Sequence, residues 1–133
     1  MGGARNAASG NCSCGELSIA ADGEPVKISA CHCRACQRRT GSAFGVAVFF
    51  HADQTETSGV STSYIRSGDS GKSVEFRFCP SCGSTVFWMA EFRKELVAVS
   101  LGCFADPSSL APTQSVYEES RLEWVVFDFT KLT

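Results

Sequence analysis

The sequence predicts a mainly β fold in one small domain. Short runs of alternating polar and apolar residues recur along the chain, and signals for helices are few. Of its 133 residues 44% are hydrophobic, which is enough for one core and too little for two ordinary domains. Residues 1–10 are small and polar, so we expect a flexible N-terminal tail there and one domain over residues 11–133.

Seven runs show the alternation typical of half-buried strands. They cover residues 16–20, 25–29, 44–50, 73–78, 85–89, 96–101 and 123–129. The connecting segments contain Gly, Ser, Asp and Pro, and residues 67–72 predict a hairpin turn between two strands. One or two short helices are expected, one over residues 36–40 that ends at Gly41, and a turn that begins at Pro107 with Asp106 as its N-cap.

The charge and the apolar segments narrow the classes of partner. The net charge is −2, which argues against nucleic acid as a partner and favours a small molecule or a protein. No run is apolar enough for a signal peptide or long enough for a membrane-spanning helix, so we expect no membrane partner and a cytoplasmic location. In that reducing compartment clustered cysteines bind metal or do redox work more often than they form disulfides. The sequence admits a homodimer.

Seven of the eight cysteines fall into three tight clusters. The clusters are Cys12 with Cys14, then Cys31, Cys33 and Cys36, then Cys79 with Cys82. The two outer pairs together offer four thiolates, the ligand set of a tetrahedral structural zinc. Gly83 and the glycine after Cys14 permit the tight turns that such pairs need. A redox dithiol at Cys79 and Cys82 is the alternative, and the glycines and the paired count favour zinc.

The middle cluster offers three thiolates within six residues. A zinc ion held there keeps one position free for water or a substrate thiol, the arrangement of a catalytic zinc. The expected total is therefore two zinc ions, one structural and one catalytic. A fourth protein ligand, a metal-free cluster and a disulfide remain as alternatives. In an extended segment the side chain of His32 points away from its neighbours, so we expect it to form hydrogen bonds or face solvent, and Cys103 is a minor alternative as a distal ligand or redox partner.

Three arginines flank the middle cluster, namely Arg34, Arg38 and Arg39. They are candidates for binding a substrate carboxylate through paired hydrogen bonds or for offsetting thiolate charge. An ordinary solvated helix face is the alternative.

Several segments together resemble a known family in order and spacing. They are GNCSCGELSI, CHCRACQRRTGSAF, SYIRSGDSGKSVEFRFCPSCGSTVFW and VAVSLGCFADPSSLAP, followed by EWVVF, and they span about residues 10–127. The chain resembles the glutathione-dependent formaldehyde-activating enzyme family, which also includes centromere protein V. The resemblance implies a fold of coiled antiparallel sheets similar to the Mss-type Rab exchange factor. It also implies a structural zinc at the outer pairs and a catalytic zinc at the middle cluster.

The reaction attributed to the family joins glutathione to formaldehyde to give S-hydroxymethylglutathione, a carbon–sulfur lyase chemistry. The resemblance therefore implies glutathione or a similar thiol, together with a small aldehyde, as substrates. A noncatalytic, zinc-stabilised protein-binding module is the alternative from a different class. A redox sensor, in which the middle cluster forms reversible disulfides, is a third hypothesis.

Overall fold

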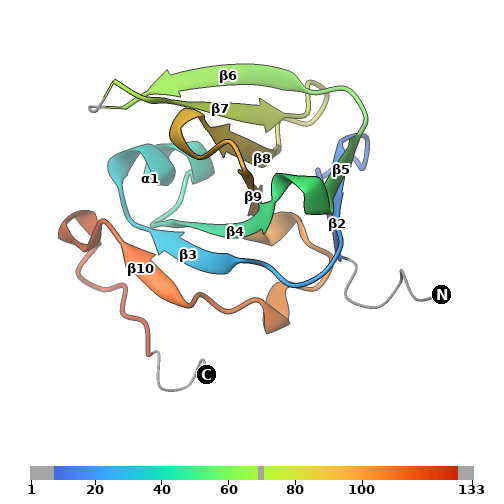
Figure 1. Cartoon of the computed structure of the whole chain (residues 1–133). Helices are drawn as coiled ribbons and strands as arrows, with labels where there is room; N and C mark the ends of the chain where they lie inside the picture. The colour runs from blue at the N-terminus through green and yellow to red at the C-terminus, as the bar shows by residue number, and fades with distance from the viewer. Residues whose placement is uncertain (1–7, 69–70, 129–133) are drawn as a thin grey trace.

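The computed structural model describes residues 8–68 and 71–128, and their fold is mainly β in one domain, as predicted. A three-stranded sheet has the order β1-β2-β5, and a seven-stranded sheet has the order β10-β3-β4-β9-β8-β7-β6. Figure 1 shows the large sheet curving from β6 at the top to β10 at the bottom. The strands are β1 (Ala8–Asn11), β2 (Ser18–Ala21), β3 (Lys27–Cys31), β4 (Gly45–His51), β5 (Thr55–Ser58), β6 (Thr62–Ser67), β7 (Ser73–Phe78), β8 (Thr85–Ala90), β9 (Leu96–Ser100) and β10 (Gln114–Val116).

Strand pairing is antiparallel throughout, except that β10 runs parallel to β3. The predicted hairpin is confirmed, because β6 and β7 pair from Ser67 opposite Ser73 to Thr62 opposite Phe78. The parallel β10 joins the C-terminal part of the chain to the strand that carries Cys31. This pairing makes neighbours of Ser29 and Gln114, which are 85 positions apart in the sequence.

The α-helix α1 (Arg34–Thr40) starts two residues earlier than predicted and ends at Gly41 as expected. Its start is fixed by Cys33, whose sulfur accepts a hydrogen bond from the Cys36 amide at 3.3 Å. Gly41 adopts φ 66°, the left-handed conformation that glycine reaches without strain, and its N–H donates to the Gln37 carbonyl. No helix in the described ranges is both long and apolar enough to cross a membrane.

Short 3-10 turns make up the remaining helical structure of the described residues. They are η2 (Ala52–Gln54), η3 (Glu91–Arg93), η4 (Leu101–Cys103), η5 (Pro107–Ser109) and η6 (Glu118–Ser120). The turn expected at Pro107 is η5, and the carboxylate of Asp106 caps it by accepting the Ser108 amide at 3.1 Å.

One hydrophobic cluster joins the two sheets. Ile19 of the small sheet and Leu17, directly before β2, pack with Val48, Val86 and Val99 of the large sheet, and each is at most 1% exposed. A single cluster of this kind is what a one-domain chain of this length can build.

Two sequence-based expectations differ from the structure. Residues 123–128 are not a strand: Val125 is buried while Trp124 and Val126 are exposed, so the alternation reflects one buried side chain in a turn-rich segment. Residue 129 lies outside the described residues, as do residues 1–7 of the expected tail. Residues 8–10 of that tail belong to β1, where Gly10 lets the backbone approach Val99, whose Cγ1 would lie 3.0 Å from an added Cβ.

Candidate metal centres

The outer cysteine pairs meet at one point, as their spacing predicted. Cys12 and Cys14 lie in the turn after β1, and Cys79 and Cys82 lie in the turn between β7 and β8. All four sulfur atoms are within 4.8 Å of one another. The sulfurs of Cys12 and Cys14, and those of Cys14 and Cys79, are each 3.6 Å apart. Zinc–sulfur bonds of about 2.3 Å in a tetrahedron require sulfur separations of about 3.8 Å, so these residues fit a zinc ion.

Backbone and hydroxyl groups around these sulfurs favour thiolates. The Leu17 amide donates to Cys12 Sγ at 3.2 Å, and the Ser81 amide donates to Cys79 Sγ at 3.4 Å. The hydroxyl and then the backbone amide of Ser84 lower the pKa of Cys82 to about 5. These hydrogen bonds favour the ionised sulfur that a metal needs.

The two turns are also tied to each other by polar contacts. The Ser13 amide donates to the Ser84 hydroxyl at 3.1 Å, and the Ser81 hydroxyl donates to the Glu16 carboxylate at 3.1 Å. The cluster therefore joins Cys14 and Cys79, which are 65 positions apart, at a place where the two chain segments are already in contact.

The middle cluster forms where β3 ends and α1 begins. Cys31 is the last residue of β3, Cys33 is the N-cap of α1, and Cys36 lies in its first turn. The three sulfur atoms are within 4.8 Å of one another, and no His, Cys, Asp or Glu in the described segments joins them as a fourth ligand. The donor set fits a zinc ion that has one open position.

Electrostatic interactions in the middle cluster shift the pKa values of Cys36 and Cys31 in opposite directions. The hydrogen bond with Cys31, followed by that with Cys33 and by the charge of Arg39, lowers the pKa of Cys36 to about 5. The same bond with Cys36, together with burial, raises the pKa of Cys31. Cys36 is thus the sulfur that ionises most readily, since its neighbours and an arginine stabilise the thiolate.

His32 is no part of this metal site, because its side chain points into a different contact network. It is 0% exposed, and its Nε2 lies 2.9 Å from the Ser115 hydroxyl and 3.5 Å from a Glu118 carboxylate oxygen. Of the two roles expected for it, hydrogen bonding is found and solvent exposure is not. Its ring is packed beside Phe44 and Phe127, at centroid distances of 5.6 and 5.4 Å.

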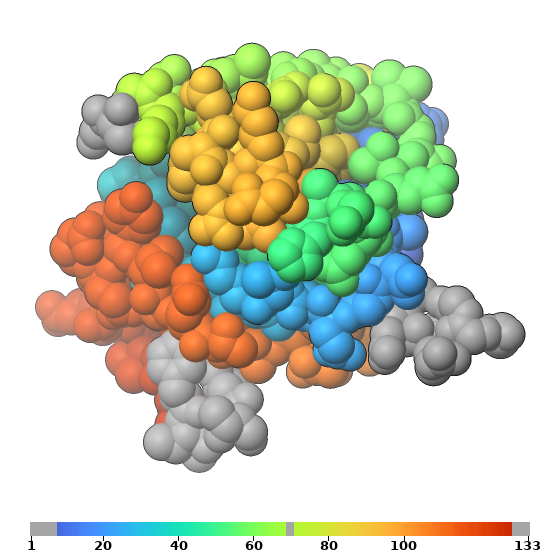
Figure 2. Space-filling view, in the orientation of Figure 1, coloured from blue at the N-terminus to red at the C-terminus, as the bar shows by residue number. Residues whose placement is uncertain are grey.

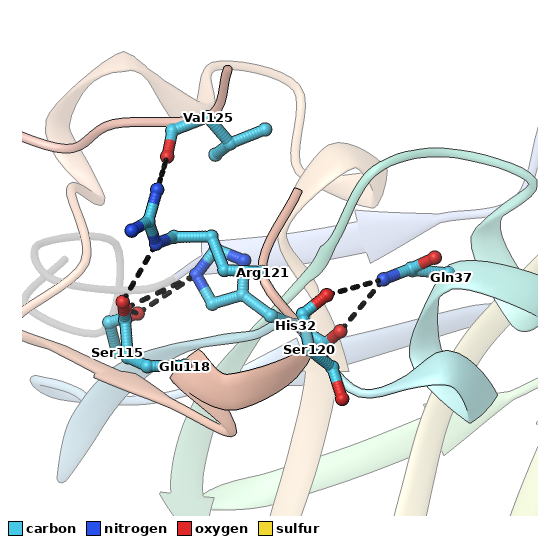
Figure 3. Close-up of polar contacts among 7 residues, drawn as sticks. All are labelled: His32, Gln37, Ser115, Glu118, Ser120, Arg121 and Val125. Carbon is cyan, nitrogen blue, oxygen red and sulfur yellow. Dashed lines mark hydrogen bonds and ion pairs between the residues drawn. The ribbon is translucent and has the colours of Figure 1, made fainter. Parts of the chain in front are cut away.

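This network, which the sequence did not reveal, binds the C-terminal segment to the cysteine loop (Figure 3). Ser115 donates to Glu118, and Arg121 Nε donates to the other Glu118 oxygen at 2.9 Å. The Ser115 hydroxyl, then Arg121 and His32, hold the pKa of Glu118 below its usual value. Ser115, Glu118 and Arg121 are 83 or more positions from His32, and no spacing rule joins them to it.

A second part of the network involves α1. The Gln37 amide group donates to the His32 carbonyl at 2.9 Å and to the Ser120 carbonyl at 3.2 Å. Arg121 Nη1 donates to the Val125 carbonyl at 2.6 Å. The loop that carries the three cysteines is therefore in contact with α1 and with the C-terminal segment.

The three arginines near the middle cluster occupy different places. Arg34 donates to the Gln37 side chain, and Arg38 is exposed on the helix. The guanidinium carbon of Arg39 lies 4.2 Å from the centre of the Trp88 ring. Arg39 also lines a cavity of about 360 Å³ together with Cys31 and Cys36.

Cys103 lies outside both clusters. Its sulfur donates to the Thr85 carbonyl at 3.7 Å, and burial raises the pKa of its thiol. It is not grouped with Cys31, Cys33 and Cys36, so the structure does not support it as their fourth ligand.

Comparisons with known proteins identify a family and a similar fold. The family model described as glutathione-dependent formaldehyde-activating enzyme matches residues 7–120. A crystal structure of a Rhodobacter sphaeroides protein has a similar fold, with a TM-score of 0.61 and 18% sequence identity, over 81% of this chain and 99% of that chain. At this identity the similarity shows the fold alone. No curated protein matches the sequence.

Proposed function

The chain belongs to the glutathione-dependent formaldehyde-activating enzyme family, and we propose that it is a zinc-dependent enzyme of the carbon–sulfur lyase type. In this proposal it joins a thiol, such as glutathione, to formaldehyde or another small carbonyl compound. Cys12, Cys14, Cys79 and Cys82 would hold a structural zinc, and Cys31, Cys33 and Cys36 would hold a catalytic zinc. When bound, the second ion would supply a Lewis acid that lowers the pKa of a thiol.

One observation carries this proposal: three clustered sulfurs adjoin a cavity, and two of their residues line it. A metal with a complete set of protein ligands binds no reactant and needs no adjoining cavity. A site with an open position needs room for a reactant. The outer cluster, by contrast, has four sulfurs within 4.8 Å of one another, which supports a closed structural site in this proposal.

The proposed reaction is an addition to a carbonyl group. A bond forms between the thiol sulfur and the carbonyl carbon, the π bond of the carbonyl group breaks, and the thiol proton ends on the new hydroxyl oxygen. The cavity walls would hold the thiol and the aldehyde together and exclude bulk water, which supplies proximity. Arg39, at the cavity and close to Cys36, would orient a substrate anion.

Exchange NMR of glutathione and formaldehyde tests the proposal. The zinc-loaded protein should speed formation and breakdown of the adduct relative to the uncatalysed reaction. Cys33→Ser should abolish the acceleration, and Cys103→Ser, which changes a cysteine outside both clusters, should retain it. Absence of any acceleration across several thiols and aldehydes would contradict the proposal.

A further inference from the structure

The cavity beside the middle cluster is built on one face of the large sheet. Its floor is formed by alternate residues of neighbouring strands, such as Ser29 and Cys31 on β3 with Gly45 and Ala47 opposite them on β4. Small residues at these positions leave the hollow, because side chains of one face repeat every second residue. Segments of β3, η3 and β10, which contribute to its lining, meet on the face shown in Figure 2 as blue, amber and orange-red surfaces.

Large apolar side chains complete the walls. Phe49, Trp88, Phe92, Leu96 and Val116 all line the cavity. Its volume of about 360 Å³ is within the range of sites that enclose small organic ligands. A ligand with an apolar body would therefore remove apolar surface from water when it binds.

Apart from the sulfurs of Cys31 and Cys36, the charged side chains that line the cavity are all cations. They are Lys27, Arg39, Arg66 and Arg93, and no Asp or Glu lines it. Arg93 is already paired, because its Nε donates to a Glu95 carboxylate oxygen at 2.7 Å. Within residues 8–68 and 71–128 the other three cations form no ion pair with a carboxylate.

Aromatic rings fix these three cations in place. The guanidinium of Arg66 lies over the Phe76 ring at 4.9 Å, and the Lys27 ammonium lies over the Phe49 ring at 5.0 Å. Cation–π contacts of this kind orient a positive group without neutralising it. Lys27 and Arg66 thus retain charge for a bound anion, whereas Arg39 also lies close to the sulfur of Cys36.

Arg39 is the most constrained of the cations. Its guanidinium lies over Trp88, and its buried Nε has no hydrogen-bond partner in the described part of the chain. An added Cβ at Gly45 would lie 2.5 Å from Arg39 Nη2, so the guanidinium occupies space that only glycine leaves open. A buried donor without a partner is unfavourable, and a carboxylate ligand would relieve part of that penalty.

The geometry points to a cavity that selects a thiol with a carboxylate, an apolar body and no ammonium group, an inference that rests on the proposed function because it names that site's substrate class. Glutathione fits less well, since its ammonium group would meet cations and find no carboxylate among the lining residues. A simple mercapto acid with an aliphatic or aromatic body offers the anion and the apolar surface without that penalty.

Ligands without sulfur test the charge selection independently of the proposed carbon–sulfur chemistry. Phenylbutyrate, phenylbutanol and phenylbutylamine share one apolar body and carry an anionic, a neutral and a cationic end. Isothermal calorimetry on the zinc-loaded protein should show phenylbutyrate binding about tenfold or more tightly than phenylbutanol, and the amine binding more weakly than either. Equal affinities for the acid and the alcohol would overturn the inference.

Two variants and a matched control locate the anion. Arg66→Gln should weaken phenylbutyrate binding about fivefold or more, whereas Arg93→Gln should change it less than about twofold, because Arg93 is paired with Glu95. Both remove one positive charge from the same cavity. An equal effect of both variants would mean that general charge, and not the unpaired cations, attracts the acid, and would also overturn the inference.

Failure of this inference is distinguishable from failure of the proposed function. If phenylbutyrate binds as expected while no thiol is converted, the cavity selects anions and the proposed chemistry is wrong. If glutathione and formaldehyde react but the acid shows no preference over the alcohol, the chemistry stands and the substrate class is wrong. Comparison of mercaptohexanoate with glutathione as substrates then ranks the two thiols, and a lower kcat/KM for mercaptohexanoate would contradict the inference.

Discussion

Gly59 is the glycine at which an added methyl group should destabilise the fold most. It has φ 98°, and an added Cβ would lie 1.8 Å from the Glu16 carbonyl oxygen, a backbone atom that cannot rotate away. We expect Gly59→Ala to lower the free energy of unfolding by about 3 kcal/mol or more, measured by urea denaturation. Gly71→Ala is the control, because Gly71 also has positive φ, 82°, but an added Cβ would meet no described residue within 4 Å. Equal losses for the two variants would contradict the clash.

Gly45 gives the opposite prediction, in which function changes more than stability. The atom that an added Cβ would meet is the end of the flexible Arg39 side chain, which can move. Gly45→Ala should therefore change the free energy of unfolding by less than about 1 kcal/mol while weakening phenylbutyrate binding several-fold. Unchanged binding of phenylbutyrate would show that the position of Arg39 does not matter for the anion.

At the residue scale the sequence predicted the two sulfur clusters and missed the contacts that support them. Cysteines two or three positions apart in the sequence lie close enough in space to bind one ion, so both sulfur clusters were predictable. His32 and Ser115 are in contact although 83 positions separate them, and no local pattern encodes such a contact. The cavity cations were only partly predicted: Arg39 was one of three arginines named beside the middle cluster, whereas Lys27, at the start of the strand that ends at Cys31, and Arg66, on β6, were not named.

At the scale of elements, β10 is a three-residue strand that pairs with β3 and carries a side chain of the His32 network. Ser115 lies in β10, and its hydroxyl links the buried His32 to Glu118. Ser115→Ala would leave buried His32 Nε2 without its hydroxyl partner, and we expect a loss of about 1–2 kcal/mol in the free energy of unfolding. Hydrogen exchange of the amides in residues 114–121 should accelerate more than exchange in β8.

A matched serine controls for the loss of a hydroxyl group. Ser63 donates to Glu75 at 2.8 Å on the exposed strand β6, so Ser63→Ala removes a similar contact in water. It should change the free energy of unfolding by less than about 0.5 kcal/mol. Equal effects of the two serine variants would mean that the His32 network does not hold β10.

The elements that the sequence predicted are those whose side chains alternate. β3, β4, β7, β8 and β9 each overlap a predicted run, because one of their faces meets the core. Strand β5, with the sequence TETS, and strand β1, with the sequence ASGN, contain no large apolar residue and were missed. Their strand structure comes from pairing with β2, which is tertiary information.

At the scale of the whole molecule, the outer cluster joins the two sheets. Cys12 and Cys14 follow the small sheet, and Cys79 and Cys82 lie between two strands of the large one. A metal there closes a loop with 64 residues between Cys14 and Cys79, whereas the middle cluster spans only six residues. The stability of the fold should therefore depend on the outer cluster far more than on the middle one.

Matched serine variants in the two clusters test this difference. Cys82→Ser should lower Tm by more than about 10 °C, because losing a ligand of the structural site removes several kcal/mol of stability. Cys33→Ser should lower Tm by less than about 5 °C. Equal losses of Tm would favour the noncatalytic module, in which both metals are structural.

The single mainly β domain was predictable from composition and alternation, because one apolar face per strand is enough to define such a core. The division of the strands into two sheets and the parallel pairing of β10 were not predictable from the sequence. Both depend on which distant strands pair, and the hydrophobic pattern of one strand does not specify its partner.

An anomalous difference map at the zinc absorption edge tests the central claim most directly. We predict two peaks, one among the sulfurs of Cys12, Cys14, Cys79 and Cys82 and one among those of Cys31, Cys33 and Cys36, the second with a fourth ligand that does not come from the protein. A single peak at the outer cluster, with the middle cysteines as free thiols or a disulfide in freshly purified protein that has met no chelator, would contradict the account.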